Sequence, residues 1–148
     1  MGEAAVRVRA AGWSDLADVE DLLAANGLPA GDVRDHPEAF VVATLDGACV
    51  AAGGLEVHGA RGLLRSVVVG APHRGRGCGT AVCDALADRA RAADVETLYL
   101  LTTTAGAFFR ARGYERVDRA AVPEEIRATA QFAELCPDSA TVMRRPVG

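Results

Sequence analysis

The sequence predicts a single domain of mixed α/β fold, in which strands and helices alternate along the chain. Two strand-like runs flank Asp46-Gly47, a dipeptide that favours a tight hairpin turn. Farther on, the run Ser66–Val69 leads through an Arg/Gly loop into a long amphipathic stretch. The chain has 148 residues, half of them apolar and 24% charged, which is enough for one hydrophobic core.

In the first half of the chain, Val6–Ala10 alternates well enough for a strand. Ser14 is expected to cap a helix that runs to Asn26 and stops at Gly27. Residues 29–36 are expected to form a short helix or an irregular turn. The apolar face of the first helix would consist of Leu16, Val19, Leu22 and Leu23.

The remaining elements are expected in a regular order. The hairpin strands are Phe40–Leu45 and Cys49–Val57, and Leu63–Val69 is the central strand. A long helix then runs to Ala93. Its expected buried residues are Val82, Leu86, Ala90 and Ala93. A strand at Leu98–Thr102, a short helix around Phe108 and Phe109 and a strand at Tyr114–Val117 are expected next. A helix at 122–136 follows; it begins near Pro123, and Pro137 comes directly after it. The last expected strand is Ala140–Arg144.

Composition excludes several classes of function. The net charge of −4 and a pI near 5.3 argue against a nucleic-acid partner. All 16 basic residues are arginine, which excludes a Walker A phosphate loop and lysine Schiff-base chemistry. No apolar run is long enough for a membrane helix, and no targeting run is present at the N-terminus. The four cysteines fit no zinc pattern, so we expect reduced thiols in a cytoplasmic protein without a metal.

The junction between the central strand and the long helix has the chemistry of a phosphate site. A helix N-terminus presents backbone N–H groups without partners and a partial positive charge. Arg74 and Arg76 add positive charge there. The three glycines allow a ligand to approach the backbone closely; they are Gly75, Gly77 and Gly79. A plain glycine-rich turn is the alternative, and the six residues alone do not exclude it.

The loop does not have the Gly-x-Gly-x-x-Gly spacing of a dinucleotide-binding fold. Its Arg-x-x-Gly-x-Gly pattern, Arg74 to Gly79, resembles motif A of the GCN5-related N-acetyltransferases (GNAT superfamily). A second segment, Ala107-Phe-Phe-Arg-Ala-Arg-Gly-Tyr114, resembles the helix of that family that ends in Gly-Phe or Gly-Tyr. The order of elements over about residues 6–117 is also similar to the GNAT order.

The resemblance implies a mostly antiparallel central sheet with helices on both faces and one splayed pair of strands. It implies acetyl-coenzyme A as co-substrate. The pantetheine arm would run along the central strand, and Phe109 would lie against the cofactor. The expected cofactor-binding residues are Val67, Val68, Val69, Arg74, Gly75, Arg76, Gly77, Cys78, Gly79, Thr80 and Phe109. GNAT relatives are often dimers, so a homodimer is one expected assembly.

In this family a neutral amine attacks the thioester directly. A strand N–H, here of Val67 or Val69, would polarise the carbonyl group. Glu56 is the candidate base because it lies near the end of the strand beside the central one; a solvated strand-end carboxylate is the alternative. His58 is a second candidate, against an ordinary loop histidine, and His73 is expected to help position the phosphate loop.

Two positions depart from the family pattern. Phe109 stands where many relatives carry a tyrosine that protonates the leaving thiolate. Residues 102–104 are threonines where many relatives carry an asparagine that contacts the cofactor. The usual general acid is therefore missing, and either coenzyme A leaves as a thiolate or another group supplies the proton.

The acceptor side is less defined. Ser66, Arg65 and Gln131 are candidates for lining it, whereas Phe132 is expected in the core. The C-terminal segment, with Val-Pro-x-x-Ile-x-x-Thr-x-Gln-Phe-x-x-Leu-Cys-Pro, resembles the N-acetyltransferases encoded beside arsenic-resistance genes. That resemblance implies a small amine or arsenical acceptor. Cys136 would be a soft ligand for an arsenical or a buried cysteine.

Two other functions remain open. One is a non-catalytic module that binds coenzyme A or senses a metalloid on the same fold. The other is acetylation of a protein N-terminus, although no basic or extended segment favours a macromolecular acceptor.

Overall fold

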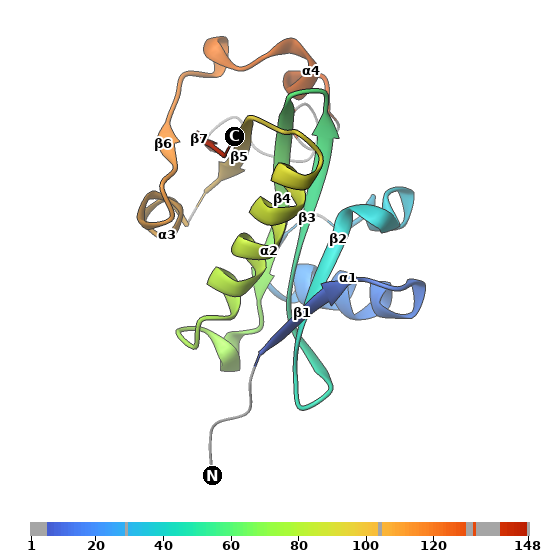
Figure 1. The fold of residues 1–148 in the computed structure, drawn as a ribbon. Coiled ribbons are helices and arrows are strands. Elements are labelled where there is room, and N and C mark those ends of the chain that lie inside the picture. The colour runs from blue at the N-terminus through green and yellow to red at the C-terminus, as the bar shows by residue number, and fades with distance from the viewer. Residues whose placement is uncertain (1–5, 29, 104, 130–131, 133–139, 148) are drawn as a thin grey trace. The chain divides into compact units, whose positions relative to one another are not determined.

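A computed structural model describes residues 6–28, 30–103, 105–129, 132 and 140–147 (Figure 1). It confirms the mixed α/β class and nearly all of the expected elements. The strands are β1 (Arg7–Ala10), β2 (Phe40–Leu45), β3 (Ala48–His58), β4 (Arg61–Val69), β5 (Thr97–Thr102), β6 (Glu115–Arg116) and β7 (Thr141–Pro146). The α-helices are α1 (Leu16–Ala25), α2 (Cys78–Ala92), α3 (Gly106–Ala111) and α4 (Glu124–Arg127), and the 3-10 helices are η1 (Trp13–Asp15), η2 (Val33–Asp35), η3 (Pro37–Ala39), η4 (Ala71–His73) and η5 (Arg119–Ala121).

The strands form a seven-stranded sheet in the order β1-β2-β3-β4-β5-β7-β6. The β1–β2, β2–β3, β5–β7 and β6–β7 pairs are antiparallel, which confirms the mostly antiparallel sheet that the resemblance implies; of these pairs, β2–β3 is a hairpin with a short turn. Asp46 and Gly47 both have positive φ, which is the backbone of the predicted hairpin turn. The β4–β5 pair is parallel, and its ladder runs only from Arg61↔Thr97 to Leu63↔Tyr99.

The chain folds into two compact units, each built from two stretches of sequence. The first unit comprises Met1–Gly54 and Ser66–Ala87, and the second comprises Leu55–Arg65 and Asp88–Gly148. That both belong to one acetyltransferase domain stays a prediction.

The core of the first unit lies where α1 packs against the strands. Leu16, Val19 and Leu23 are fully buried, as the helical pattern predicts. Their cluster also contains Phe40, Val42, Ala52 and Val68. Helix α2 packs at Gly53, where an added Cβ would lie 2.7 Å from Val82 Cγ1. Because Ala52 and Gly53 are consecutive in β3, α1 and α2 cover opposite faces of the strands in this unit.

The core of the second unit is a cluster of apolar side chains from its strands and from the segment before β7. Its members are Leu63, Tyr99, Val122, Ile126, Phe132 and Val142. The burial of Phe132 confirms its expected place in the core. The Arg119 guanidinium lies over the Phe132 ring, 5.2 Å from its centroid, which adds a cation–π contact to the apolar packing.

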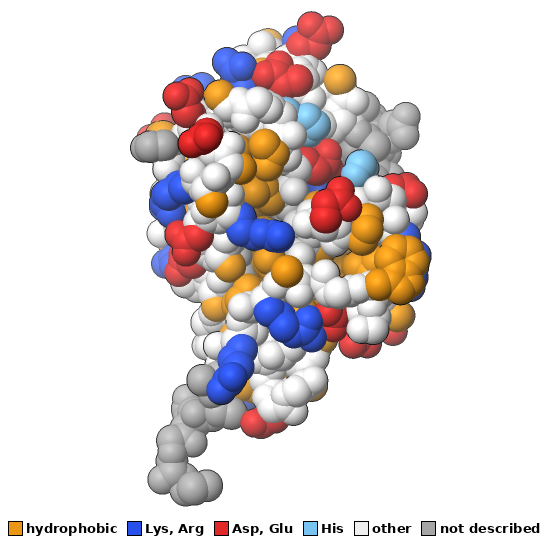
Figure 2. Space-filling view, turned by 45° about the vertical axis from the view of Figure 1, so that its right-hand side comes forward, with side chains coloured by type: hydrophobic (Ala, Val, Ile, Leu, Met, Phe, Trp, Pro, Cys, Tyr) orange, Lys and Arg blue, Asp and Glu red, His pale blue; other side chains and the backbone are white. Residues whose placement is uncertain are grey.

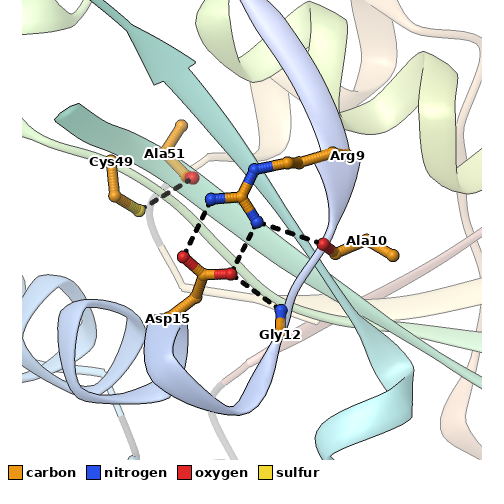
Figure 3. A network of polar contacts seen from close by, with 6 residues as sticks. All are labelled: Arg9, Ala10, Gly12, Asp15, Cys49 and Ala51. Carbon is orange, nitrogen blue, oxygen red and sulfur yellow. Dashed lines mark hydrogen bonds and ion pairs between the residues drawn. The ribbon is translucent and has the colours of Figure 1, made fainter. Parts of the chain in front are cut away.

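Two details of the helices differ from the sequence prediction. Ser14 does not cap the first helix, because η1 precedes α1 and the Asp15 carboxylate accepts the Gly12 N–H at 2.7 Å (Figure 3). The same carboxylate accepts two hydrogen bonds from Arg9 of β1, which joins the strand to the turn (Figure 3). Ala93 is exposed rather than buried, because α2 ends one residue before it.

The expected helix at 122–136 is interrupted in its described part. Helix α4 ends at Arg127, and residues 128 and 129 form a turn. The Thr129 hydroxyl donates to the Ile126 carbonyl at 2.8 Å, which is the local side-chain bond that competes with a continuing helix. Of residues 130–136, the structure describes only Phe132.

The surface carries charges of both signs. Figure 2 shows arginine and acidic side chains interspersed on one face of the molecule, with single apolar side chains between them. Across the part of the chain that the structure describes, no helix has both the length and the apolar character needed to cross a membrane.

Candidate functional site

The loop between β4 and α2 has the backbone expected of a phosphate cradle. Gly75 and Gly77 have φ values of 78° and 82°, in the left-handed region that favours glycine. A Cβ added to either would find no atom within 4 Å, so the space above the loop is open. The two glycines therefore keep the backbone both turned and accessible.

The first turn of α2 supplies the donors. Ala81 N–H donates to Gly77 O at 3.0 Å, so the amides of Cys78 and Gly79 precede the first helical hydrogen bond. The helix has 15 residues and carries no acidic residue in its first turn, which leaves the positive end of its dipole uncompensated there. This arrangement of amides fits a phosphate or pyrophosphate group.

Arg74 is partly committed to the protein. Its Nη2 donates to the Asn26 Oδ1 at the end of α1, and its Nε donates to the Val69 carbonyl at 3.4 Å. Arg76 is exposed. The side chain of Arg74 is thus held beside the loop by its hydrogen bond to the carbonyl of Val69, the last residue of β4.

His73 ends η4 immediately before the loop. Its backbone N–H donates to Gly70 O at 2.9 Å, and the Gly70 N–H donates to Val50 O at 2.8 Å. The His73 Nδ1 atom is buried, and it makes no hydrogen bond to the described residues. These bonds support the prediction that His73 positions the loop, and they leave one ring atom with unmet hydrogen-bonding capacity.

Sequence reasoning missed the backbone of Ser66. This residue has a φ of 56° in the middle of β4, which is uncommon for a residue other than glycine. A left-handed residue interrupts the regular pleat of a strand. The only signal in the sequence is a serine at the start of a run of valines. Ser66 and the three valines after it belong to the first unit with the loop.

The second unit brings together three residues predicted for the chemistry. Arg65 Nη1 donates to Glu56 Oε2 at 3.1 Å, and His58 Nε2 lies 3.3 Å from Glu56 Oε1. The Arg65 side chain is fully buried, whereas those of Glu56 and His58 are 14% and 29% exposed. Glu56 is therefore not a freely solvated strand-end carboxylate. The Arg65 guanidinium donates to this carboxylate and is not exposed at the surface.

A second ion pair lies in the same unit. Arg61 Nη1 donates to Glu125 Oε1 of α4 at 2.9 Å. The hydrogen bond of the Glu125 carboxyl with its own backbone N–H, together with that from Arg61, lowers the pKa of this carboxyl. His58 contributes a smaller lowering of the same pKa, which places it within electrostatic range of Glu125.

The other predicted positions fall in different places. Phe109 is buried, and its ring makes edge-to-face contacts with Phe108 and Tyr114 at centroid distances of 5.1 and 5.6 Å. That it also contacts the cofactor stays a prediction. Gln131, Cys136 and Thr104 lie outside the described residues.

The described cysteines are poor candidates for metalloid chemistry. Cys78 and Cys83 are buried, and burial raises the pKa of the Cys49 thiol to about 11. Cys49 donates weakly to Ala51 O near the Arg9–Asp15 pair (Figure 3). No group of three or more histidine, cysteine or acidic residues that would suit a metal ion occurs among the described residues.

Comparison with solved structures supports the fold. The N-acetylglutamate synthase from Neisseria gonorrhoeae complexed with coenzyme A and N-acetyl-glutamate has a TM-score of 0.85 at 20% identity. The match covers 99% of this chain but 36% of that one, so this chain spans about a third of the synthase. Rv2747 from Mycobacterium tuberculosis in complex with coenzyme A has a TM-score of 0.82 at 23% identity, covering 95% of this chain and 98% of that one.

The ribosomal-protein-S18-alanine N-acetyltransferase from Escherichia coli is also similar, with a TM-score of 0.74 at 17% identity, and the match covers 97% of this chain and 95% of that one. At these identities the likeness shows the fold. A search of curated protein sequences finds no match. The sequence profile described as the acetyltransferase (GNAT) family matches residues 7–116, which is well over half of the chain. The chain therefore belongs to the GNAT family of acetyltransferases.

Proposed function

We propose that this protein is an acetyl-coenzyme A-dependent N-acetyltransferase that acts in the cytoplasm and transfers acetyl directly to a small amine. The observation that carries the proposal is the cradle of the first unit, where two left-handed glycines lead into the open amides of α2. Two of the similar structures are complexes with coenzyme A, which supports acetyl-coenzyme A as the co-substrate.

In this proposal the chain holds the co-substrate by its backbone. The amides of Cys78 and Gly79 bind the pyrophosphate, and the exposed Arg76 adds positive charge. The pantetheine arm lies along Val67–Val69, and a strand N–H there polarises the thioester carbonyl. The left-handed residue Ser66 interrupts the regular pleat of β4 just before these valines, so the proposed carbonyl site begins at this residue.

The acid–base group of the proposal contains Glu56. The amine nitrogen attacks the carbonyl carbon, the carbon–sulfur bond breaks, and coenzyme A leaves with the electron pair. The amine proton passes to a group that the carboxylate supplies or orients. Because Phe109 packs between two aromatic rings and carries no hydroxyl, it cannot protonate the thiolate. The thiolate leaves unprotonated or takes a proton from water.

Acceptors for the test come from two sources. The synthase complex contains N-acetyl-glutamate, so amino acids belong in a first panel. The resemblance of the C-terminal segment adds arsenical analogues of amino acids and a role in arsenic resistance. The raised pKa of the Cys49 thiol and the burial of Cys78 and Cys83 give no support to a metalloid role for these three cysteines.

The experiment is release of the coenzyme A thiol from acetyl-coenzyme A, with a panel of small amines, amino acids and arsenical amino-acid analogues. We expect release that depends on the acceptor, and we expect Glu56→Gln to lower the rate while acetyl-coenzyme A affinity is kept. Glu115→Gln, an exposed carboxylate on β6, is the matched control and should leave the rate unchanged.

The alternative is a non-catalytic module that binds coenzyme A or senses a metalloid. Its supporting observation is the phenylalanine at the position of the usual acid. Saturable binding of acetyl-coenzyme A with no acceptor-dependent release across the panel would favour that module. Absence of binding would contradict the proposed cradle at residues 74–80.

A further inference from the structure

The last turn of α1 lies against the start of the phosphate loop. Gly70 follows β4 directly, and a Cβ added to it would lie 3.4 Å from Leu22 Cδ2 of α1. The Gly70 N–H donates to the carbonyl of Val50 in β3 at 2.8 Å. All three residues belong to the first unit, as the whole loop does. The entry to the loop is therefore held by both α1 and β3.

Asn26, which follows α1 as its C-cap residue, joins the same helix end to Arg74. Its Nδ2 donates to the Leu22 carbonyl at 2.8 Å, and its Oδ1 accepts from Arg74 Nη2. A carbonyl only accepts and a guanidinium only donates, so the two partners fix the orientation of the Asn26 amide. Arg74 Nε donates to Val69 O at 3.4 Å, so the Nε–Nη2 edge, which could otherwise bind two phosphate oxygens, faces protein oxygens. The bond between Asn26 Oδ1 and Arg74 Nη2 is the Asn26–Arg74 clamp.

The residues after Arg74 need such a tether. Gly75 and Gly77 are both left-handed, and an added Cβ at either would find no atom within 4 Å. A glycine that nothing packs against has many other conformations available, and holding it in one of them costs conformational entropy. The far end of the loop is fixed by the first bond of α2, from Ala81 N–H to Gly77 O at 3.0 Å. The clamp fixes the near end.

We propose that Asn26 is a positioning residue for acetyl-coenzyme A, which holds the phosphate loop in its binding conformation through the Asn26–Arg74 clamp. This inference rests on the proposed function. The Arg74 side chain then orders the protein, and the exposed Arg76 carries the positive charge toward the pyrophosphate. Loss of the clamp lowers the fraction of molecules whose loop is ready to bind, and the apparent Kd rises by the reciprocal of that fraction.

The first test is a double-mutant cycle measured by calorimetric titration with acetyl-coenzyme A. Asn26→Ala and Arg74→Ala each remove the clamp, so each should raise Kd about tenfold, the effect of one hydrogen bond to a charged group. The double variant should bind no more weakly than Arg74→Ala. Arg7→Ala, which removes an exposed arginine from β1, is the matched control for the lost charge and should keep the natural Kd. Normal binding by Asn26→Ala, or single effects that multiply in the double variant, would overturn the proposal.

The second test separates the clamp from the stability of α1. The carboxylate in Asn26→Asp still accepts from Arg74 but cannot donate to the Leu22 carbonyl. Asn26→Asp and Asn26→Ala therefore both lose the bond at the helix end, and both should have a lower Tm. We expect Asn26→Asp to keep the natural Kd, and Asn26→Ala to show a raised KM for acetyl-coenzyme A with kcat at saturation unchanged. Equal weakening of binding in the two variants would mean that Asn26 acts through helix stability alone, which would overturn the proposal.

The last measurement needs no ligand. Amide hydrogen exchange in the free protein, followed by NMR, reports how often the turn before the loop opens. The His73 N–H, which donates to Gly70 O at 2.9 Å, should exchange about tenfold faster in Asn26→Ala than in the natural chain. The Ala11 N–H, bonded to Phe40 O at 3.0 Å in the same unit, is the control and should not change. Unchanged exchange at His73 would overturn the inference even if the enzyme is active. The expected exchange in a protein that binds no acetyl-coenzyme A contradicts the proposed function instead.

Discussion

The packing of α2 on β3 leaves no room for a methyl group at Gly53, and Gly53→Ala tests how far the phosphate cradle depends on that contact. The new Cβ would lie 2.7 Å from Val82 Cγ1, 2.9 Å from Leu86 Cδ1 and 3.3 Å from Val67 Cγ2. Carbon atoms in contact are ordinarily about 3.5–4.0 Å apart. The shortfall is about 1 Å at two helix residues.

The size of the effect follows from which neighbours can move. Leu86 has a flexible end and can rotate. Val82 is β-branched and has essentially one side-chain rotamer in a helix, so the helix itself must shift there. Overpacking of this kind costs about 1–3 kcal/mol. For a chain of this length about 2 kcal/mol corresponds to a fall of roughly 6 °C in Tm. Val82 is one turn after Cys78, so the shift also displaces the amides of the cradle.

Thermal unfolding followed by circular dichroism and calorimetric titration with acetyl-coenzyme A measure the two consequences. We expect a lower Tm and weaker binding in Gly53→Ala. Gly31→Ala is the matched control, because Gly31 is exposed and its added Cβ meets nothing within 4 Å. If Gly53→Ala unfolds within about 0.5 kcal/mol of Gly31→Ala, the range for neutral surface changes, the packing argument is wrong.

Three further predictions concern single residues. Ser66→Val should destabilise the protein by about 1 kcal/mol in urea unfolding, despite the strand preference of valine, because a β-branched side chain fits a positive φ worse than serine does; a stabilised variant would refute this. Cys49, with its thiol pKa raised from 9.0 to about 11, should react with iodoacetamide at pH 8 about 100-fold more slowly than in the unfolded chain, as measured by peptide mass spectrometry. The Arg9 hydrogen bond and the Gly12 N–H lower the pKa of Asp15, so its contribution to stability is present above the usual carboxyl range and is lost as pH falls through the folded pKa. The difference in unfolding free energy between the natural chain and Asp15→Asn should therefore shrink below about pH 4, and a constant difference would contradict the assignment.

Much of the fold follows from patterns that act over a few residues. The strand at Phe40–Leu45 and the turn at Asp46-Gly47 have the predicted bounds, because alternation and turn chemistry are local. The glycines of the cradle were also predictable, since their left-handed backbone is a property that few other residues share. The interruption after α4 was not predictable from the pattern, because the hydroxyl of Thr129, which donates to Ile126 O, competes with helix propensity.

The partners of the polar residues were not predictable in the same way. Arg65 lies among apolar residues of β4, and nothing beside it in sequence shows which carboxylate it meets. That carboxylate, Glu56, is nine residues earlier on another strand. Alternation along β3 places Glu56 and His58 on one face of the strand. Which residue of the neighbouring strand contacts them, here Arg65, depends on the strand pairing, which the local pattern does not give. The sequence thus indicated Glu56 and His58 as candidates without the contact between Glu56 and Arg65 that the structure shows.

The burial of Arg65 raises the question of what the ion pair with Glu56 contributes to the protein. Burying an ion pair gives little net stability, because both charges lose hydration, whereas removing one partner leaves the other unpaired at a cost of about 3–5 kcal/mol. An apolar pair of similar volume would serve the core of the second unit as well. A fully buried guanidinium on Oε2 does, however, fix the rotamer of Glu56, and that in turn fixes the ring of His58. The buried guanidinium therefore orders the Glu56 carboxylate, an effect on orientation rather than on net stability.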